Sequence, residues 1–109
     1  MANAETNLQA IIMMALSEAG HTPLRNNTGA YLDKTGRMVR YGVGGKGGPD
    51  LWVVCRDGIA CGIEVKTKTG KVRPEQAAFI KWLRSRGGRA GIARSAEDAI
   101  KIARGDICD

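Results

Sequence analysis

Apolar residues near the start of the chain recur at spacings of three and four, which is the repeat of one face of an α-helix. They are Leu8, Ile11, Ile12, Ala15, Leu16 and Ala19. Asn3 precedes them as a helix-capping residue, and Gly20 follows them as a residue that commonly ends a helix. The pattern therefore predicts a first helix over about residues 4 to 19.

The next part of the chain has shorter apolar runs separated by turn-forming residues. We expect a short extended piece over residues 24–27. Residues 31–32 and 38–41 flank Asp33-Lys34-Thr35-Gly36, which favours a hairpin. Five glycines lie within residues 42–48, so this segment is predicted to be a mobile loop or to approach a ligand closely.

Two longer runs of apolar and β-branched residues, 51–56 and 59–66, predict two central strands. Asp57-Gly58 joins them and is a strong short signal for a hairpin turn. Beyond a basic loop over residues 67–73, Pro74 suits the first position of a second helix. The apolar stripe of that helix is Phe79, Ile80 and Leu83.

The end of the chain predicts one more strand and one more helix. Gly87-Gly88 ends the second helix, and residues 89–94 form a short apolar strand. Ser95 followed by Asp98 resembles a capping box, which opens a last helix that runs to Gly105.

This order of elements predicts an α/β fold, with a mixed sheet flanked by helices in the order α-β-β-β-α-β-α. The length suits one domain, and we expect residues 1–109 to form it. Cys55, Cys61 and Cys108 are odd in number and lack metal-type spacing with His21, the single histidine. We expect reduced, structural thiols, and a helix-end role for His21.

The chain has a net charge of +6, and its positive charge is concentrated in its second half. Residues 65–94 hold nine basic residues and one acidic residue, Glu75. Such a charge attracts polyanions, most commonly nucleic acid, with a solvated basic face as the alternative. The sequence shows neither an apolar run long enough for a bilayer nor a signal peptide, so we expect a cytoplasmic protein.

Two acidic residues and a lysine stand at the ends of the central strands. Asp50 precedes one strand, and Glu64 and Lys66 lie near the end of the other. Side chains alternate along a strand, so Glu64 and Lys66 share a face and Val65 lies on the other. Asp50, Glu64 and the Val65 carbonyl can supply oxygen ligands to a hard divalent cation. Lys66 can hold an attacking water or offset charge on a phosphate, which predicts phosphodiester hydrolysis.

A simpler interpretation of the Glu-x-Lys pair is an exposed, salt-bridged face of an edge strand. The spacing also raises a geometric conflict. With a two-residue turn at Asp57-Gly58, Asp50 would lie opposite Val65 and would not face Glu64. We therefore predict a bulge at Gly58, a longer loop, or a bend where the first of the two strands begins.

Five short motifs occur in order along the chain. They are Glu5, Arg25-Asn26-Asn27 with Gly29, Lys46-Gly47-Gly48-Pro49-Asp50, Glu64-Val65-Lys66 and Pro74-Glu75-Gln76. In these motifs, over about residues 5 to 95, the chain resembles the virus-type replication-repair nuclease (VRR-NUC) domain of the PD-(D/E)xK superfamily. The resemblance implies a restriction-endonuclease-like core. Residues 30–45 match the family poorly.

The resemblance also implies a set of catalytic residues. Asp50, Glu64 and the main-chain oxygen of Val65 would bind Mg²⁺ or Mn²⁺. Lys66 would be catalytic together with the two acids, and Gln76 would support them. For Gln76, the alternative is an ordinary exposed residue in the first turn of a helix.

Other candidates each have a structural alternative. Glu5 is a possible further metal residue, or it complements the dipole of the first helix. The DNA-binding candidates are Arg25, Asn27, Lys46, Lys68, Lys71 and Arg73. Arg25 and Asn27 could instead form a turn, and Lys46 could simply solvate its loop. For Trp82, we expect packing on the sheet or a subunit interface.

Two functions from different classes follow from these residues. The first is a metal-dependent, structure-selective DNA endonuclease that resembles Holliday-junction resolvases and acts as a homodimer, since cutting both strands of a junction symmetrically needs two sites. The alternative is a non-catalytic nucleic-acid-binding module with a nuclease-like fold. Binding that persists in EDTA without metal-stimulated cleavage would favour the module.

Overall fold

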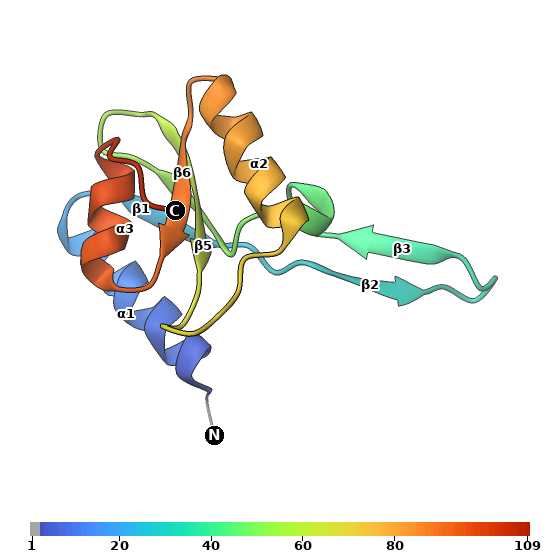
Figure 1. Cartoon of the computed structure of the whole chain (residues 1–109). Coiled ribbons are helices and arrows are strands. Elements are labelled where there is room, and N and C mark those ends of the chain that lie inside the picture. Colours follow the sequence, from blue (N-terminus) through green and yellow to red (C-terminus); the bar gives the residue numbers. More distant parts are fainter. Residues whose placement is uncertain (1–2) are drawn as a thin grey trace.

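The computed structural model describes residues 3–109 (Figure 1). Its elements are α1 (Ala4–Glu18), β1 (Thr22–Arg25), β2 (Gly29–Leu32), β3 (Met38–Tyr41), the 3-10 turn η1 (Gly45–Gly47), β4 (Leu51–Val54), β5 (Ala60–Val65), α2 (Pro74–Ser85), β6 (Arg89–Ala93) and α3 (Ala96–Ala103). The predicted helices and strands are all present, with ends shifted by a residue or two.

Four strands form the main sheet, in the order β1-β4-β5-β6. β1, β4 and β5 pair antiparallel, whereas β6 pairs parallel with β5 after the crossover through α2. The elements of this sheet and its helices follow the predicted order α-β-β-β-α-β-α, which confirms the mixed α/β fold. β2 and β3 form a separate two-stranded sheet between β1 and β4 in the chain.

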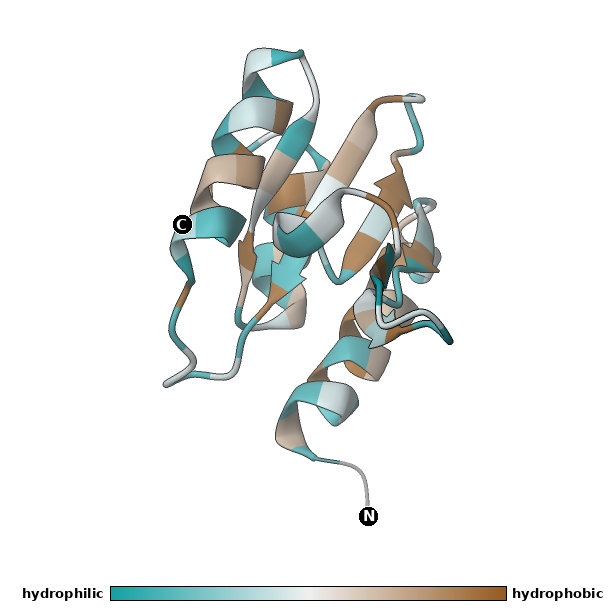
Figure 2. Cartoon of the chain, turned by 90° about the vertical axis from the view of Figure 1, so that its right-hand side faces the viewer, coloured by the Kyte–Doolittle hydropathy of each residue, from teal (hydrophilic) through white to brown (hydrophobic). Residues whose placement is uncertain are grey.

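The main sheet lies between two layers of helix, with α1 and α3 on one face and α2 on the other (Figure 1). Figure 2 shows hydrophobic residues along the strands between these helices. Cys61, Ile63 and Val65 of β5 belong to the core beneath α1 and α3. Gly62 of the same strand approaches Leu83 of α2. The two faces of β5 are therefore divided as the sequence predicts.

The position of β5 excludes one interpretation of the Glu-x-Lys pair. β5 is flanked by β4 and β6, so it is an inner strand and not an edge strand. The Glu64 side chain faces α2, and only 4% of Glu64 is exposed. The alternative prediction that Glu64 lies on an exposed, salt-bridged face of an edge strand is therefore wrong. Burial of a carboxyl group costs free energy unless it has hydrogen-bond partners.

The β2–β3 hairpin projects from the body of the molecule (Figure 1). Its turn is the predicted one: an Asp33 carboxylate oxygen accepts hydrogen bonds from the N–H groups of Thr35 and Arg37 and from the Thr35 hydroxyl. Gly36 has a positive φ of 80°, which glycine adopts without strain. The hairpin leaves large apolar side chains exposed, including Tyr31, Leu32 and Met38.

The glycine-rich segment after β3 makes its close approach to α2. A Cβ atom at Gly47 would collide with the main-chain oxygen of Glu75, and one at Gly44 would lie 2.9 Å from Phe79 Cε2. The side chain of Asn26 also holds this segment, because its Nδ2 donates to the Val43 carbonyl oxygen at 2.7 Å. The glycines here permit close contact with α2.

Helix ends follow the local signals in the sequence. Asn3 Oδ1 accepts from the Thr6 N–H at 2.8 Å, and Ser95 Oγ accepts from the Asp98 N–H at 3.1 Å. His21, just beyond α1, is buried, and its Nδ1 accepts from the Arg56 N–H at 3.1 Å. The His21 N–H also donates to the Leu16 carbonyl of α1 at 3.0 Å, which confirms its predicted helix-end role, and the Asn3 and Ser95 contacts confirm the predicted caps.

All three cysteines are free thiols, and burial raises the pKa of the Cys108 thiol. Trp82 packs on Phe79, with ring centroids 5.4 Å apart, yet remains 49% exposed. Within residues 3–109, no helix has the length and apolar character needed to cross a membrane.

Candidate active site

A three-residue loop between β4 and β5 resolves the conflict over register. The Cys55 N–H donates to the Ile59 carbonyl at 3.0 Å, and the Gly58 N–H donates to the Cys55 carbonyl at 2.7 Å. Gly58 has a positive φ of 85°, which fits a three-residue hairpin loop ending in a left-handed residue. The prediction of a loop longer than two residues is confirmed.

This loop shifts the pairing of the two strands by one residue relative to a two-residue turn. Leu51 lies opposite Ile63, so the next position along brings Asp50 opposite Glu64. Directly opposed residues share a face of an antiparallel sheet, with Cβ atoms about 5 Å apart. The two acidic side chains therefore start from neighbouring positions on the α2 side of the sheet.

Each carboxyl group also has a hydrogen-bond donor. Asp50 Oδ2 accepts from the main-chain N–H of Val65 at 2.8 Å. Glu64 Oε1 accepts from Gln76 Nε2 at 2.8 Å, and Gln76 is 3% exposed. The other end of the Gln76 amide is fixed as well, because its Oε1 accepts from the Arg73 N–H at 2.9 Å. Gln76 is a buried partner of Glu64, so the alternative prediction of an ordinary exposed residue is wrong.

The surroundings of Glu64 disfavour its negative charge. Burial is the largest cause, and the neighbouring Asp50 carboxylate adds to it, so the pKa of Glu64 rises to about 9. The charges of Lys66 and Arg73 act in the opposite direction. Without further positive charge nearby, Glu64 is therefore protonated at neutral pH.

Lys66 and the Val65 main chain complete this group. Lys66 follows β5 directly, is half-buried, and anchors its N–H on the Ala93 carbonyl of β6 at 3.0 Å. The Val65 N–H points to Asp50. Within a strand, the N–H and C=O of one residue point to the same side, so the Val65 carbonyl also faces the side of Asp50. The lysine, both acids and this carbonyl thus lie at one end of β5.

The donor set suits a hard divalent cation. Two carboxylates and a main-chain carbonyl are oxygen ligands of the kind that Mg²⁺ and Mn²⁺ prefer. A cation between the acids would offset the repulsion that raises the pKa of Glu64. No group of three or more His, Cys, Asp or Glu side chains that could hold a metal is present within residues 3–109. Two carboxylates and one carbonyl would leave positions for water or substrate oxygens in the octahedral shell of Mg²⁺.

The other predicted residues are distributed around this group. Arg25 ends β1 and contacts Met13 Sδ through its Nη2, and Asn27 is exposed just beyond it. Lys68 and Lys71 are exposed in the loop between β5 and α2. Glu5 lies in the first turn of α1, and none of the hydrogen bonds described for residues 3–109 joins it to Asp50 or Glu64.

Asn26 and Arg94 support the site through contacts that the sequence did not indicate. Asn26 donates to the carbonyl oxygens of Val43 and Pro49, so it connects β1 to the segment that leads into Asp50. Arg94 Nη1 donates to the carbonyl oxygens of Thr67 and Gly70 and thereby holds the basic loop. Both act through long-range main-chain contacts, for which a single sequence carries no local signal.

The fold is thus a mixed α/β sheet in which an Asp and a Glu face each other with a lysine two residues on, the arrangement predicted above for phosphodiester hydrolysis. The sequence model of the VRR-NUC domain matches residues 3–97. The chain therefore belongs to the VRR-NUC domain family, a family of nucleases. Membership implies phosphodiester hydrolysis and DNA as the substrate.

A comparison with solved structures supports the fold. A structure described as a VRR_NUC domain is 23% identical to this chain and superposes with a TM-score of 0.65. The match covers 95% of this chain and 98% of the other. A search of curated proteins finds no significant match.

Proposed function

We propose that this protein is a metal-dependent, structure-selective DNA endonuclease of the Holliday-junction-resolvase type, and that it acts as a homodimer. The main support is the register of β4 and β5, which places Asp50 opposite Glu64, with Lys66 at the same end of β5. A buried carboxyl group next to a second acidic side chain is costly in a structural role, so the position of Glu64 beside Asp50 and a lysine favours catalysis.

In this proposal, Asp50, Glu64 and the Val65 carbonyl hold Mg²⁺ or Mn²⁺. When bound, the cation polarises the phosphate and makes a bound water more acidic. The Val65 N–H orients the Asp50 carboxylate, and the Gln76 amide orients that of Glu64. Gln76 is thus a positioning residue. The Lys66 amine holds the attacking water or offsets negative charge that develops on the phosphate.

The junction substrate and the dimer belong together. All residues of the proposed site come from one chain, so a single protomer offers one cutting site. Symmetric cutting of a four-way junction needs two sites related by a twofold axis, which a homodimer supplies.

The test is cleavage of a labelled four-way junction with Mg²⁺ or Mn²⁺, compared for wild type, Lys66→Ala and Asp50→Asn. We expect both variants to lose at least about 100-fold in rate, because each removes a charge that acts in the transition state. Lys81→Ala is a matched control, since Lys81 is an exposed lysine on α2.

Equal cutting by wild type and Lys66→Ala would contradict the proposed role of the lysine. Junction binding in EDTA without any metal-stimulated cutting by the wild type would instead favour a non-catalytic binding module. Cutting of linear duplex at the same rate as the junction would contradict the structure selectivity.

A further inference from the structure

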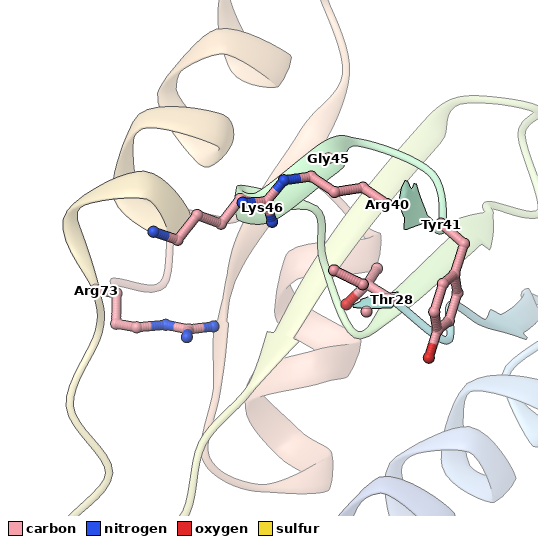
Figure 3. Close-up of a pocket in the computed structure, with 8 residues that line it drawn as sticks. Thr28, Arg40, Tyr41, Gly45, Lys46 and Arg73 are labelled. Carbon is pink, nitrogen blue, oxygen red and sulfur yellow. The ribbon is translucent and has the colours of Figure 1, made fainter. Parts of the chain in front are cut away.

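A cavity of about 290 Å³ lies between the base of the β2–β3 hairpin and the start of α2. Three cationic side chains line it: Arg40 from β3, Lys46 from η1, and Arg73 from the position before α2 (Figure 3). The other lining residues are Thr28, Gly29, Ala30, Tyr41 and Gly45. None of the lining residues is acidic.

The positive charge of this cavity is largely uncompensated by the protein. Within residues 3–109, Arg40 and Lys46 take part in none of the ion pairs that the structure contains. Among residues 3–109, Arg73 forms an ion pair with Glu75, in which its Nε lies 3.6 Å from Glu75 Oε1, and the Arg73 side chain is 61% exposed. An exposed pair at that separation is weak. Three like charges around one cavity repel each other, and an anion placed there would relieve the repulsion.

The two arginines approach the cavity from different elements. In Figure 3, Arg40 and Arg73 extend toward each other from opposite sides of the opening. Close packing of Gly47 against the Glu75 main chain holds η1, and with it Lys46, against α2. A guanidinium group presents several N–H donors in a fixed plane, which suits the oxygens of a phosphate.

The cavity is connected to the proposed active site through Arg73. The Arg73 N–H donates to Gln76 Oε1, and the same amide group donates to Glu64. The charge of Arg73 also acts on the Glu64 carboxyl. A DNA strand carries a phosphate at every nucleotide, so a strand cut at Asp50 and Glu64 has further phosphates on both sides of the cut, and one of them can lie in this cavity.

We propose that Arg40, Lys46 and Arg73 form a subsite that binds one backbone phosphate of the DNA strand next to the phosphate that is cut. This inference rests on the proposed function and adds Arg40, and with it the β2–β3 hairpin, to the DNA-binding surface. The hairpin base then acts as one wall of a phosphate site, and α2 and its preceding residue act as the other.

The test measures junction binding in EDTA by fluorescence anisotropy at several salt concentrations. Arg40→Gln is compared with wild type and with Arg86→Gln, a matched loss of charge at an exposed position beyond the far end of α2. We expect Arg40→Gln to weaken binding about fivefold and to reduce the slope of log affinity against log salt by about 0.9, one phosphate contact. Arg86→Gln should stay within about twofold of wild type.

A second experiment tests whether the cavity binds a phosphate of DNA or a free phosphate ion. Inorganic phosphate is titrated into wild type and Arg40→Gln while the amide resonances of Gly29 and Gly45 are followed by NMR. We expect weak binding to wild type that a short oligonucleotide displaces. Phosphate that binds as tightly as DNA and resists displacement would identify a free-anion site and overturn the proposal.

An unchanged salt slope in Arg40→Gln, or an equal effect of Arg86→Gln, would also overturn the proposal. The proposed nuclease function can fail separately, because these measurements need no cleavage. If wild type binds through Arg40 yet never cuts, the subsite stands and the catalytic assignment fails. If wild type cuts and Arg40→Gln binds and cuts like it, the catalytic assignment stands and the subsite fails.

Discussion

Glu64 carries a buried carboxyl group that faces the carboxyl group of Asp50 and accepts a hydrogen bond from Gln76. In the metal-free protein, its pKa is about 9, against an ordinary value of 4.5. The folded state therefore binds a proton more tightly at Glu64 than the unfolded state does. At the scale of single residues, the negative charge of Glu64 is therefore unfavourable unless a proton neutralises it or a cation binds beside it.

This difference predicts how the stability of the metal-free protein depends on pH. The contribution of protonated Glu64 is fully present below about pH 4.5 and is lost as the pH rises through about 9. In EDTA, the free energy of unfolding should fall between about pH 5 and about pH 9, by at most about 1.4 kcal/mol per pH unit from this group. Urea unfolding across that range measures it.

Glu64→Gln is the control for this prediction. Glutamine keeps the size and a hydrogen-bonding oxygen for Gln76, but it has no proton to lose in this range. The variant should therefore show a flatter pH dependence than wild type. Parallel curves for the two proteins would mean that Glu64 ionises normally in the folded state.

At the scale of elements, the β2–β3 hairpin differs from the rest of the fold. It forms its own two-stranded sheet and projects from the body, whereas β5 is buried along most of its length (Figure 1). An isolated two-stranded hairpin is marginally stable in water, because it buries little apolar surface. The hairpin base nevertheless supplies Arg40 and Tyr41 to the cationic cavity.

We therefore expect the hairpin to open more readily than the main sheet. In native-state hydrogen exchange, the hydrogen-bonded amides of β2 and β3 should exchange at least about 100-fold faster than those of β5. Addition of junction DNA in EDTA should slow exchange in the hairpin and leave β5 unchanged, if the hairpin base contacts DNA. Equal protection of β3 and β5 in the free protein would contradict the expected difference.

Local sequence signals predict most of the helices and strands, but they do not predict the residues that support the site through long-range contacts. Asn3, Ser95 and Pro74 mark helix starts through contacts within a few residues, so the sequence predicts them well. Asn26 and Arg94 act across 17 and 27 residues of chain, on Val43 and Thr67 respectively. Nothing near either residue in the sequence indicates its partner, so their supporting roles emerge only from the fold.

At the scale of the whole molecule, the positive charge favours binding to a polyanion, and the exposed apolar surface favours contact with another protein. The chain has a net charge of +6, which suits a polyanionic substrate. Large apolar side chains are exposed on α1, at Ile11 and Met14, and on the hairpin, at Leu32 and Met38. Exposed apolar surface of this kind is common at protein interfaces.

The proposed homodimer predicts two protomers on each four-way junction. Sedimentation velocity at micromolar protein, in EDTA and at moderate salt, should show a protein dimer and a complex of one dimer with one junction. The mass of the complex separates this stoichiometry from others. A protein that stays monomeric and binds the junction as a single protomer would contradict the dimer and the symmetric cutting derived from it.

The sequence by itself determined the order of helices and strands, the nuclease family and the residue types at the candidate site, because these depend on periodicity, capping and short motifs. The tertiary structure decided whether Asp50 meets Glu64. The loop that ends at Gly58 has three residues and not two, and this one extra residue moves Asp50 to the same face of the sheet as Glu64, since side chains alternate with a period of two. The grouping of Arg40 with Arg73 likewise depends on the folded path of the chain, which brings residues 33 positions apart to one cavity.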